Sequence, residues 1–321
     1  MKRRQLIQLG MAAAACGGPA WANTWPTRPV QLVCAFPPGS GVDFAARLLA
    51  TRLASVLGQP FVVSNRAGAA GTVAAAHVAA SPPDGYTLLV NSASHTLYPA
   101  MYSNLKFDAA RDTVGIASIC EVELILVTSP QKGLKSLQEV VEKFRKSSEE
   151  LTFASAGHGS STHIAFERLA HATGLRRVHI PFKGTPESVA EVVSGRVDLC
   201  YGVVASTLPL IKAGQLVPLA VSGKRRSATL PEVPTTEQAG YPESGYTSWI
   251  GLLGPAGTPP AVIERLSAEV GTALALPEIS TRLLGAGQVP MIKTSAEFTA
   301  QLQGEYVSNA ALIKAAGVKP Q

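Results

Sequence analysis

Two stretches of the chain combine glycine and serine with a following helix in a pattern that suits anion binding. The first is Phe36-Pro37-Pro38-Gly39-Ser40-Gly41-Val42-Asp43, and the second is Ala156-Gly157-His158-Gly159-Ser160-Ser161-Thr162-His163, about 120 residues later. Each stretch joins an apolar run to an amphipathic run, which predicts a strand that turns into a helix. The N-terminus of a helix presents backbone N–H groups that have no partner within the helix, and such groups bind anions. We expect the two turns to face one anionic ligand.

The first turn lies in an alternating pattern of short apolar runs and helical runs. The expected strands cover residues 30–36, 61–64 and 86–90, with helices between them. This alternation predicts a parallel sheet with helices on both faces, and ligands of such sheets sit at the carboxyl ends of the strands. The loop that contains Ser92 and His95 follows the third strand, so it is a third candidate wall of the site.

The same α/β pattern begins again after residue 150. A long apolar run at 115–129 is expected to be one strand that crosses into a second domain, and residues 230–245 are expected to lead back. The sequence therefore predicts the α/β class with two domains and a ligand cleft between them. The expected boundaries are 23–122 with 228–321 for domain 1, and 123–227 for domain 2.

The first 22 residues have the pattern of an export signal. Lys2, Arg3 and Arg4 precede a short uncharged run, and Ala20-Trp21-Ala22 is a small-x-small cleavage sequence. We expect cleavage after Ala22 and export to the periplasm by the Sec or the twin-arginine route. A membrane anchor, and lipid attachment at Cys16, are the alternatives considered for this segment.

Charge and cysteine content exclude several classes of protein. Loss of the signal lowers the formal net charge from +6 to +3, and no basic block with interleaved aromatic residues follows, so we expect no nucleic-acid partner. With 46% apolar and 16% charged residues, the chain is globular. Cys34, Cys120 and Cys200 each lie in an apolar run, which predicts buried thiols, with one disulfide as the alternative.

An enzyme is the leading alternative of another class. Ser160 with His163 or His158 could pair a nucleophile with a base, but the sequence has no Gly-x-Ser-x-Gly elbow. It also has no Cys/His metal cluster in sequence and no Gly-Lys-Ser/Thr phosphate loop. The sequence therefore predicts no catalytic residues, no metal and no cofactor.

Several motifs in order resemble the Bug family, the periplasmic solute-binding receptors of tripartite tricarboxylate transporters. They are the Phe-Pro-Pro-Gly turn that ends in Asp43, Pro83-Asp84-Gly85-Tyr86-Thr87-Leu88, Gly157-x-Gly159-Ser160-x-x-His163, Pro181-Phe182-Lys183-Gly184, Leu230-Pro231-Glu232-Val233-Pro234-Thr235 and Gly254-Pro255-Ala256-Gly257-Thr258-Pro259. The resemblance implies the fold of type II periplasmic binding proteins, which close on a small carboxylate without chemistry. It implies contacts from Gly39, Ser40, Gly41, Val42, Ala156, Gly157, Ser160 and Ser161.

The remaining candidate ligand-binding residues come from the same turns and neighbouring loops: Phe36, Pro38, Asp43, Ser92, His95, His158, Lys183 and Asp198. Ser40 and His158 depart from the usual family pattern, so they bear on ligand identity. Ser160 and Ser161 can cap the next helix as well as bind an anion, because both roles use the same donors.

Five side chains have a structural alternative. Asp43 either caps its helix or receives a ligand ammonium group, and His95 either lines the cleft or packs beneath it. His163 is expected to hold its turn by a ring hydrogen bond. Lys183 either meets a distal carboxylate or is solvated, and Asp198 either anchors a water or caps a turn.

The resulting hypothesis is a periplasmic receptor for a small organic carboxylate. The resemblance implies transporter membrane subunits as partners, and we expect a monomer. A receptor that informs a sensor protein, without a transporter of its own, is the alternative within the same class.

Overall fold

The computed structural model describes residues 25–315 together with Val318 and Pro320. The export signal expected at residues 1–22 and the lipid-attachment alternative at Cys16 lie outside the described residues. Within the described part, no helix has the length and apolar character needed to cross a bilayer.

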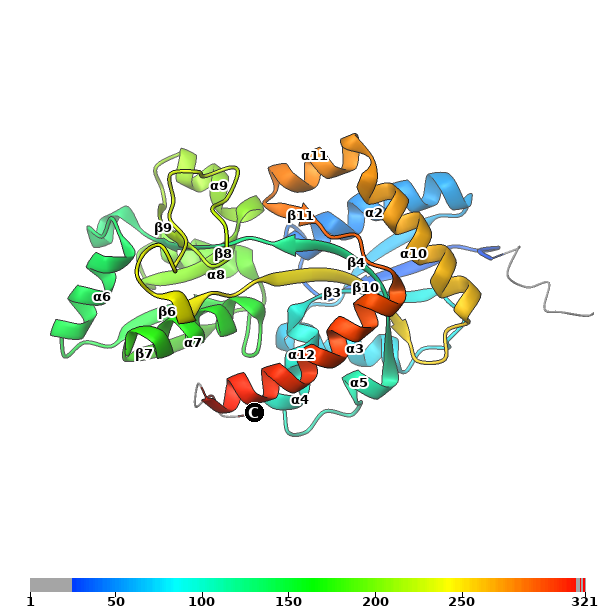
Figure 1. The fold of residues 1–321 in the computed structure, drawn as a ribbon, viewed down its shortest axis with the longest axis horizontal. Helices are drawn as coiled ribbons and strands as arrows, with labels where there is room; N and C mark the ends of the chain where they lie inside the picture. Colours follow the sequence, from blue (N-terminus) through cyan, green and yellow to red (C-terminus); the bar gives the residue numbers. More distant parts are fainter. Residues whose placement is uncertain (1–24, 316–317, 319, 321) are drawn as a thin grey trace, which may run out of the picture.

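Two sheets organise the described residues (Figure 1). The first has six strands in the order β11-β4-β10-β3-β1-β2, and the second has five in the order β7-β6-β8-β5-β9. The strands of the first sheet are β1 (Val30–Cys34), β2 (Phe61–Asn65), β3 (Thr87–Ser92), β4 (Thr113–Val122), β10 (Ser248–Pro255) and β11 (Gln288–Pro290). Those of the second are β5 (Leu124–Thr128), β6 (Leu151–Ser155), β7 (Arg177–Pro181), β8 (Leu199–Val203) and β9 (Val217–Val221).

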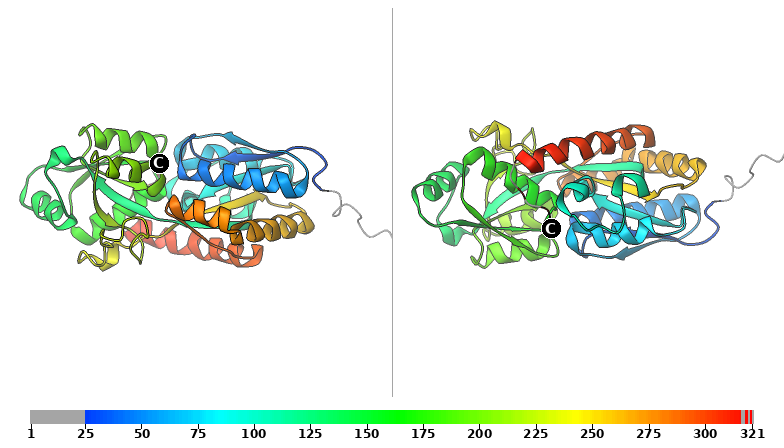
Figure 2. Two further views of the ribbon diagram at one scale, coloured as in Figure 1. Left: turned by 90° about the horizontal axis from the view of Figure 1, so that it is seen from above. Right: turned by 90° about the horizontal axis from the view of Figure 1, so that it is seen from below.

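Helices cover both faces of each sheet, as the two views in Figure 2 show. In the first domain they are α2 (Gly41–Leu57), α3 (Thr72–Ala79), α4 (Tyr98–Met101), α5 (Ala109–Asp112), α10 (Pro260–Ala275), α11 (Pro277–Gly285) and α12 (Ser295–Ala315). In the second they are α6 (Leu137–Lys146), α7 (Ser161–Thr173), α8 (Thr185–Val193) and α9 (Val204–Lys212). Two α/β domains were expected, and the structure has them. The exact domain boundaries stay a prediction.

The central strands form because they are apolar on both faces. In β1, Val30, Leu32, Val33 and Cys34 are fully buried, which is typical of a parallel strand covered by helices on both sides. β1 pairs in parallel with β2 and β3, as the alternating pattern predicted. The complete sheet is mixed, however, because β10 is antiparallel to both β3 and β4. No pattern in the sequence indicates the direction of this return strand.

The crossing between the domains differs from the expected single strand. The apolar run at 115–129 forms two strands, β4 in the first sheet and β5 in the second, with a break at Glu123. The backbone N–H of Glu123 donates to Gly287 O at 2.9 Å instead of continuing either ladder. β4 and β10 pair along their length and run between the two domains in Figure 1.

The three cysteines lie in the buried cores of the domains. Cys34, Cys120 and Cys200 are free and buried, which confirms the predicted thiols. Burial raises the pKa of Cys34 to about 12, so its thiol is protonated and inert.

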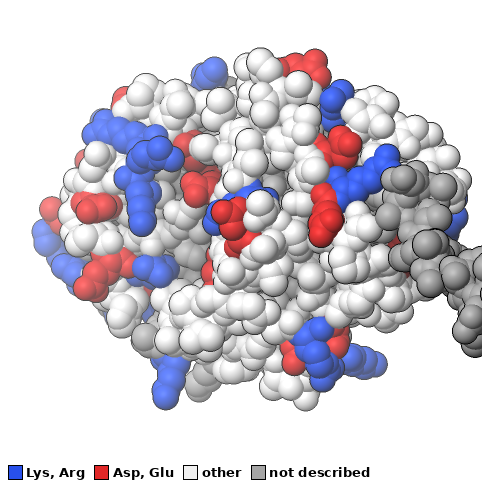
Figure 3. Space-filling model, turned by 45° about the vertical axis from the view of Figure 1, so that its right-hand side comes forward, with Lys and Arg blue, Asp and Glu red and all other residues white. Residues whose placement is uncertain are grey.

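On the face drawn in Figure 3, acidic and basic side chains are interspersed.

Candidate functional site

The two glycine-serine turns have the same backbone and the same cap. Ser40 precedes α2 and Ser160 precedes α7, and both have φ −72° and ψ 160°. The Ser40 hydroxyl accepts the N–H of Asp43 at 3.2 Å, and the Ser160 hydroxyl accepts the N–H of His163 at 3.3 Å. Each serine is therefore an N-cap that holds the first turn of its helix.

A second bond closes each turn from the other side. Gly39 N–H donates to the Asp43 carboxylate at 3.1 Å, and Gly159 N–H donates to His163 Nδ1 at 3.0 Å. The glycines have φ of +80° and +74°, a region that glycine enters without strain. The ring hydrogen bond expected for His163 is thus confirmed. The two turns therefore have the same backbone conformation and the same pattern of hydrogen bonds, although each follows a strand of a different sheet.

The caps leave two backbone donors at the start of each helix. Among the described residues, no acceptor is present for the N–H groups of Gly41 and Val42 in α2, or of Ser161 and Thr162 in α7. First-turn N–H groups carry the positive end of the helix dipole. Four donors from two domains are therefore available for one anion.

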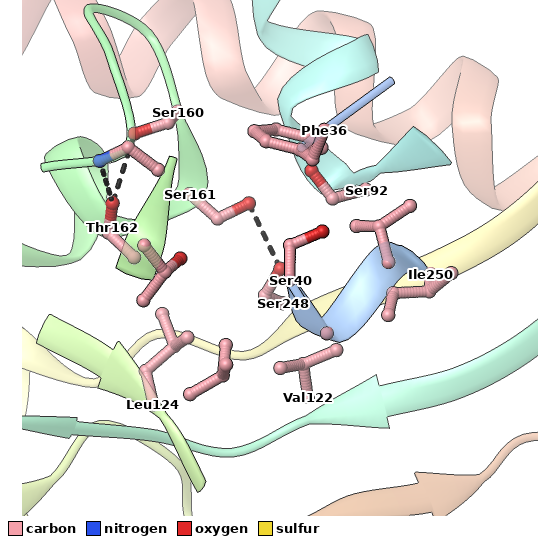
Figure 4. A pocket seen from close by; sticks show the side chains of 15 residues that line it. Phe36, Ser40, Ser92, Val122, Leu124, Ser160, Ser161, Thr162, Ser248 and Ile250 are labelled. Atoms are coloured by element: carbon pink, nitrogen blue, oxygen red, sulfur yellow. Dashed lines mark hydrogen bonds between the residues drawn. The ribbon is translucent and has the colours of Figure 1, made fainter. Parts of the chain in front are cut away.

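Both turns line one cavity of about 40 Å³ between the sheets (Figure 4). Its lining comprises Phe36, Ser40, Gly41, Val42, Ser92, Val122, Leu124, Ala156, Ser160, Ser161, Thr162, Thr185, Val203, Ser248 and Ile250. Of the predicted site residues, the structure therefore brings together Phe36, Ser40, Gly41, Val42, Ser92, Ala156, Ser160 and Ser161. Their contact with a ligand stays a prediction.

The residues missing from the prediction come from the crossing strands and the second sheet. They are Val122, Leu124, Thr162, Thr185, Val203, Ser248 and Ile250. Ser248 donates to the Ser161 hydroxyl at 2.9 Å and so links the return strand to α7. The Thr162 hydroxyl accepts the N–H of Ala156 at 2.9 Å. Thr162 lies in the second glycine-serine turn and Thr185 directly follows the Pro181-Phe182-Lys183-Gly184 motif, whereas the other five residues lie on strands and depend on their register.

The other predicted residues lie around the cavity and not in its lining. Pro38 and Gly39 border an outer groove with α8 and α9. Gly157 packs against Ala70, where an added Cβ would lie 3.3 Å from the Ala70 nitrogen. The carbonyl of His158 accepts the Tyr102 hydroxyl at 2.5 Å, so His158 joins the second domain to the first.

Asp43 points away from the cavity. Its carboxylate accepts from Arg47 at 3.0 Å and from Asn65 at 2.8 Å, besides Gly39. Burial raises the pKa of Asp43, but the hydrogen bonds from Arg47, Asn65 and Gly39 outweigh burial and lower it overall. Asp43 therefore stabilises its turn as a charged hydrogen-bond acceptor, which is the capping alternative.

His95, Lys183 and Asp198 also lie outside the lining. His95 is fully buried, its Nε2 lies 2.9 Å from the Thr113 hydroxyl, and burial lowers its pKa to about 4. Lys183 is exposed. Asp198 precedes β8, at the opposite end from Val203, and pairs with Lys132 at 2.8 Å.

Three histidines cluster beneath the second turn and are the described group most suited to a metal ion. The ring nitrogens of His158, His163 and His179 lie within 4.8 Å of one another. However, the rings of His163 and His179 are stacked, with centroids 3.9 Å apart and planes 6° from parallel. A metal lies in the plane of each imidazole that binds it, so two stacked rings cannot share one ion. This arrangement does not fit a metal.

The geometry of two serine–histidine pairs, Ser160–His163 and Ser155–His179, does not suit nucleophilic catalysis. The Ser160 hydroxyl contacts the Thr162 hydroxyl and the backbone of His163, while the His163 ring is engaged by Gly159. His179 Nε2 lies 2.6 Å from Ser155 Oγ, but Ser155 is fully buried. Burial first, and then the charges of His163 and His158, lower the pKa of His179 to about 3.

Comparison with known proteins identifies the family of this chain. Residues 45–318 match the family described as "Tripartite tricarboxylate transporter family receptor". The protein BugT of Bordetella pertussis is 33% identical over 316 residues, covering 98% of this chain and 97% of BugT.

Two solved structures have closely similar folds. "R. palustris Rpa4515 with adipate" is 30% identical with a TM-score of 0.89, covering 92% of this chain and 100% of that one. "MatC (Rpa3494) from Rhodopseudomonas palustris with bound malate" is 28% identical with a TM-score of 0.84, covering 90% of this chain and 100% of that one. The chain belongs to the tripartite tricarboxylate transporter receptor family, the periplasmic solute-binding receptors that include the Bug proteins.

Proposed function

We propose that this protein is a periplasmic receptor that closes on a small organic carboxylate and delivers it to the membrane subunits of a tripartite tricarboxylate-type transporter. The observation that carries the proposal is the convergence of four unpartnered N–H groups, from helices on two different sheets, on one cavity. Adipate and malate, the ligands named for the two similar structures, are both carboxylates. A ligand held by both domains stabilises the closed state through its differential affinity for that state.

The proposal includes three finer points. The chain is exported by a cleavable signal at residues 1–22, it acts as a monomer, and it binds without chemistry. The first point is supported by the charged and apolar pattern of that segment and by the periplasmic family. The third is supported by the ring of His163, whose Nδ1 accepts the N–H of Gly159, while the Ser160 hydroxyl contacts the Thr162 hydroxyl.

Thermal unfolding of the refolded mature chain against a panel of organic acids tests the receptor function. An acid at about 100 times its dissociation constant should stabilise the protein by roughly 2.7 kcal/mol, which raises the midpoint by several degrees. Gly41→Val should abolish this rise, because a Cβ at Gly41 already lies 3.0 Å from Gln288 and 3.5 Å from Val203.

Gly304→Val is the matched control, since Gly304 is also helical and an added Cβ there meets nothing within 4 Å. It should keep the ligand-dependent rise. If no acid raises the midpoint of the unmodified chain, the receptor proposal is wrong.

A sensing receptor without a transporter is the second candidate, because the same cavity would serve it. Deletion of the gene separates the two. Loss of uptake of the ligand identifies transport, whereas normal uptake with loss of the transcriptional response identifies sensing.

A further inference from the structure

The short strand β11 carries a buried polar side chain next to the cavity lining. Gln288, its first residue, is fully buried. β11 is the edge strand beside β4 (Figure 1), and Gln288 lies opposite Val122 in their antiparallel pair. Residues directly opposite each other in such a pair project to the same face of the sheet. Val122 lines the cavity, whereas Gln288 does not, so Gln288 lies behind the lining.

The Gln288 amide connects β11 to the start of α2. Its Nε2 donates to Gly41 O at 2.8 Å, and an added Cβ on Gly41 would lie 3.0 Å from this nitrogen. Among the described residues, none donates to the buried Oε1 of Gln288. A buried acceptor without a donor lowers stability, and an apolar side chain of the same length would avoid that cost. The bond to Gly41 is therefore the contact through which the amide can contribute.

This bond acts on a peptide group whose other end faces the cavity. Gly41 is the first residue of α2, and its carbonyl belongs to the same planar peptide group as the N–H of Val42. The two bonds of a trans peptide point in opposite directions, so a donor at the oxygen restrains the direction of the N–H. It also polarises the group, which makes the N–H a stronger donor. The Val42 N–H is one of the four cavity donors that have no acceptor among the described residues.

The second turn has no equivalent of this contact. Its corresponding peptide group joins Ser161 and Thr162, the first two residues of α7. The Ser161 hydroxyl accepts from Ser248, and the Thr162 hydroxyl accepts the N–H of Ala156. Both bonds involve side-chain oxygens and not the carbonyl of the peptide group. The contact from Gln288 therefore distinguishes α2 from α7, although the two helices have the same cap.

We propose that Gln288 is a positioning residue of the carboxylate site, which orients and polarises the Gly41–Val42 peptide group so that the Val42 N–H binds the ligand. Gln288 does not touch the ligand and acts only through this peptide group. The inference rests on the proposed function, because it assumes that the N-terminus of α2 binds a carboxylate.

Titration calorimetry of the refolded mature chain tests the inference. The probes are malate, adipate, succinate and glutarate. Gln288→Met keeps the length of the side chain and removes the donor, so we expect each acid that binds to bind about threefold or more weakly. The thermal midpoint of the unliganded variant should stay close to that of the unmodified chain, because the unsatisfied Oε1 is removed together with the bond.

Gln138→Met is the matched control. Gln138 also donates from Nε2 to a backbone carbonyl, Ala239 O at 2.9 Å, but it lies outside the lining of the cavity. Its replacement should leave the affinity unchanged. If Gln288→Met does not unfold cooperatively, Gln288→Leu removes the same donor and takes its place in the experiment.

The amide signals of the unliganded protein test the physical step directly. The chemical shift of an amide nitrogen responds to hydrogen bonding at the preceding carbonyl. Gln288→Met should therefore move the Val42 nitrogen to lower chemical shift and leave the Thr162 nitrogen in place. An unchanged Val42 signal, or a lower thermal midpoint with unchanged affinity, overturns the inference and leaves the receptor function intact. If none of the four acids binds the unmodified chain, both proposals are overturned.

Discussion

At the scale of single residues, the two turns differ in the atom that accepts the glycine N–H. In the first turn the acceptor is a carboxylate, Asp43, which is braced by Arg47. In the second it is the ring nitrogen Nδ1 of His163, whose Nε2 lies 3.5 Å from Glu167. His163 is 2% exposed and Gly159 is buried, so this N–H has little access to solvent. The second turn therefore depends on one ring nitrogen.

Replacing His163 separates this acceptor from the volume of the ring. His163→Leu removes the acceptor and leaves a buried N–H unsatisfied, which costs about 1–3 kcal/mol. We expect a lower thermal midpoint and weaker carboxylate binding by calorimetry. His163→Asn is the matched variant, because its amide oxygen can replace Nδ1, and it should lie closer to the unmodified protein in both measurements. Equal effects of Leu and Asn would show that ring packing, and not the hydrogen bond, holds the turn.

At the scale of elements, the sequence predicted the local features of the two turns. It did not predict the features that depend on how distant strands pair. The caps at Ser40 and Ser160 connect residues only three apart, so the residue pattern reveals them. Val122 and Ile250 enter the cavity because β4 and β10 cross between domains and pair antiparallel, with Ile250 opposite Cys120. The order of the strands along the chain does not determine which residues of β4 and β10 lie opposite each other. The apolar residues of the lining could therefore not be predicted from the sequence, whereas the two capped helix N-termini could.

The contact between the N-terminus of α8 and the first turn tests domain closure. Gly184 has φ −167°, which any residue adopts, but an added Cβ would lie 2.4 Å from Pro37 Cγ on the other domain. Gly184→Ala should therefore weaken carboxylate binding by roughly tenfold or more, because the closed state becomes strained. Its effect on the stability of the unliganded protein should be small, up to about 1 kcal/mol for the changed N-cap.

Gly245→Ala is the control for this closure experiment. Its nearest atoms to an added Cβ are 3.8 Å away, so its affinity should equal that of the unmodified protein. Normal affinity of Gly184→Ala would mean that the ligand-bound state does not bring Gly184 and Pro37 together.

At the scale of the whole molecule, two histidines whose pKa values are lowered in the fold couple folding to pH. The folded chain holds the pKa of His95 at about 4 and that of His179 at about 3, in both cases chiefly by burial. In the unfolded chain both have a pKa of about 6.5. Between these values the unfolded state binds more protons, so stability falls as the pH falls below about 6.5. Above pH 7 neither histidine is protonated in either state, and neither changes stability with pH.

The thermal midpoint should therefore be nearly constant from pH 8 to pH 7 and should fall steadily from pH 6.5 to pH 4.5. His95→Gln removes one of the two groups and should flatten that slope, even if its midpoint at pH 7 is lower because the bond to Thr113 is disturbed. His171→Gln is the control, because His171 is exposed and its replacement should leave the slope unchanged. The ion-paired carboxylates Asp43 and Asp198, whose pKa values are lowered in the fold, lose their contribution only near and below pH 4. A slope between pH 6.5 and pH 4.5 that survives removal of both His95 and His179 would therefore assign the acid sensitivity to other groups.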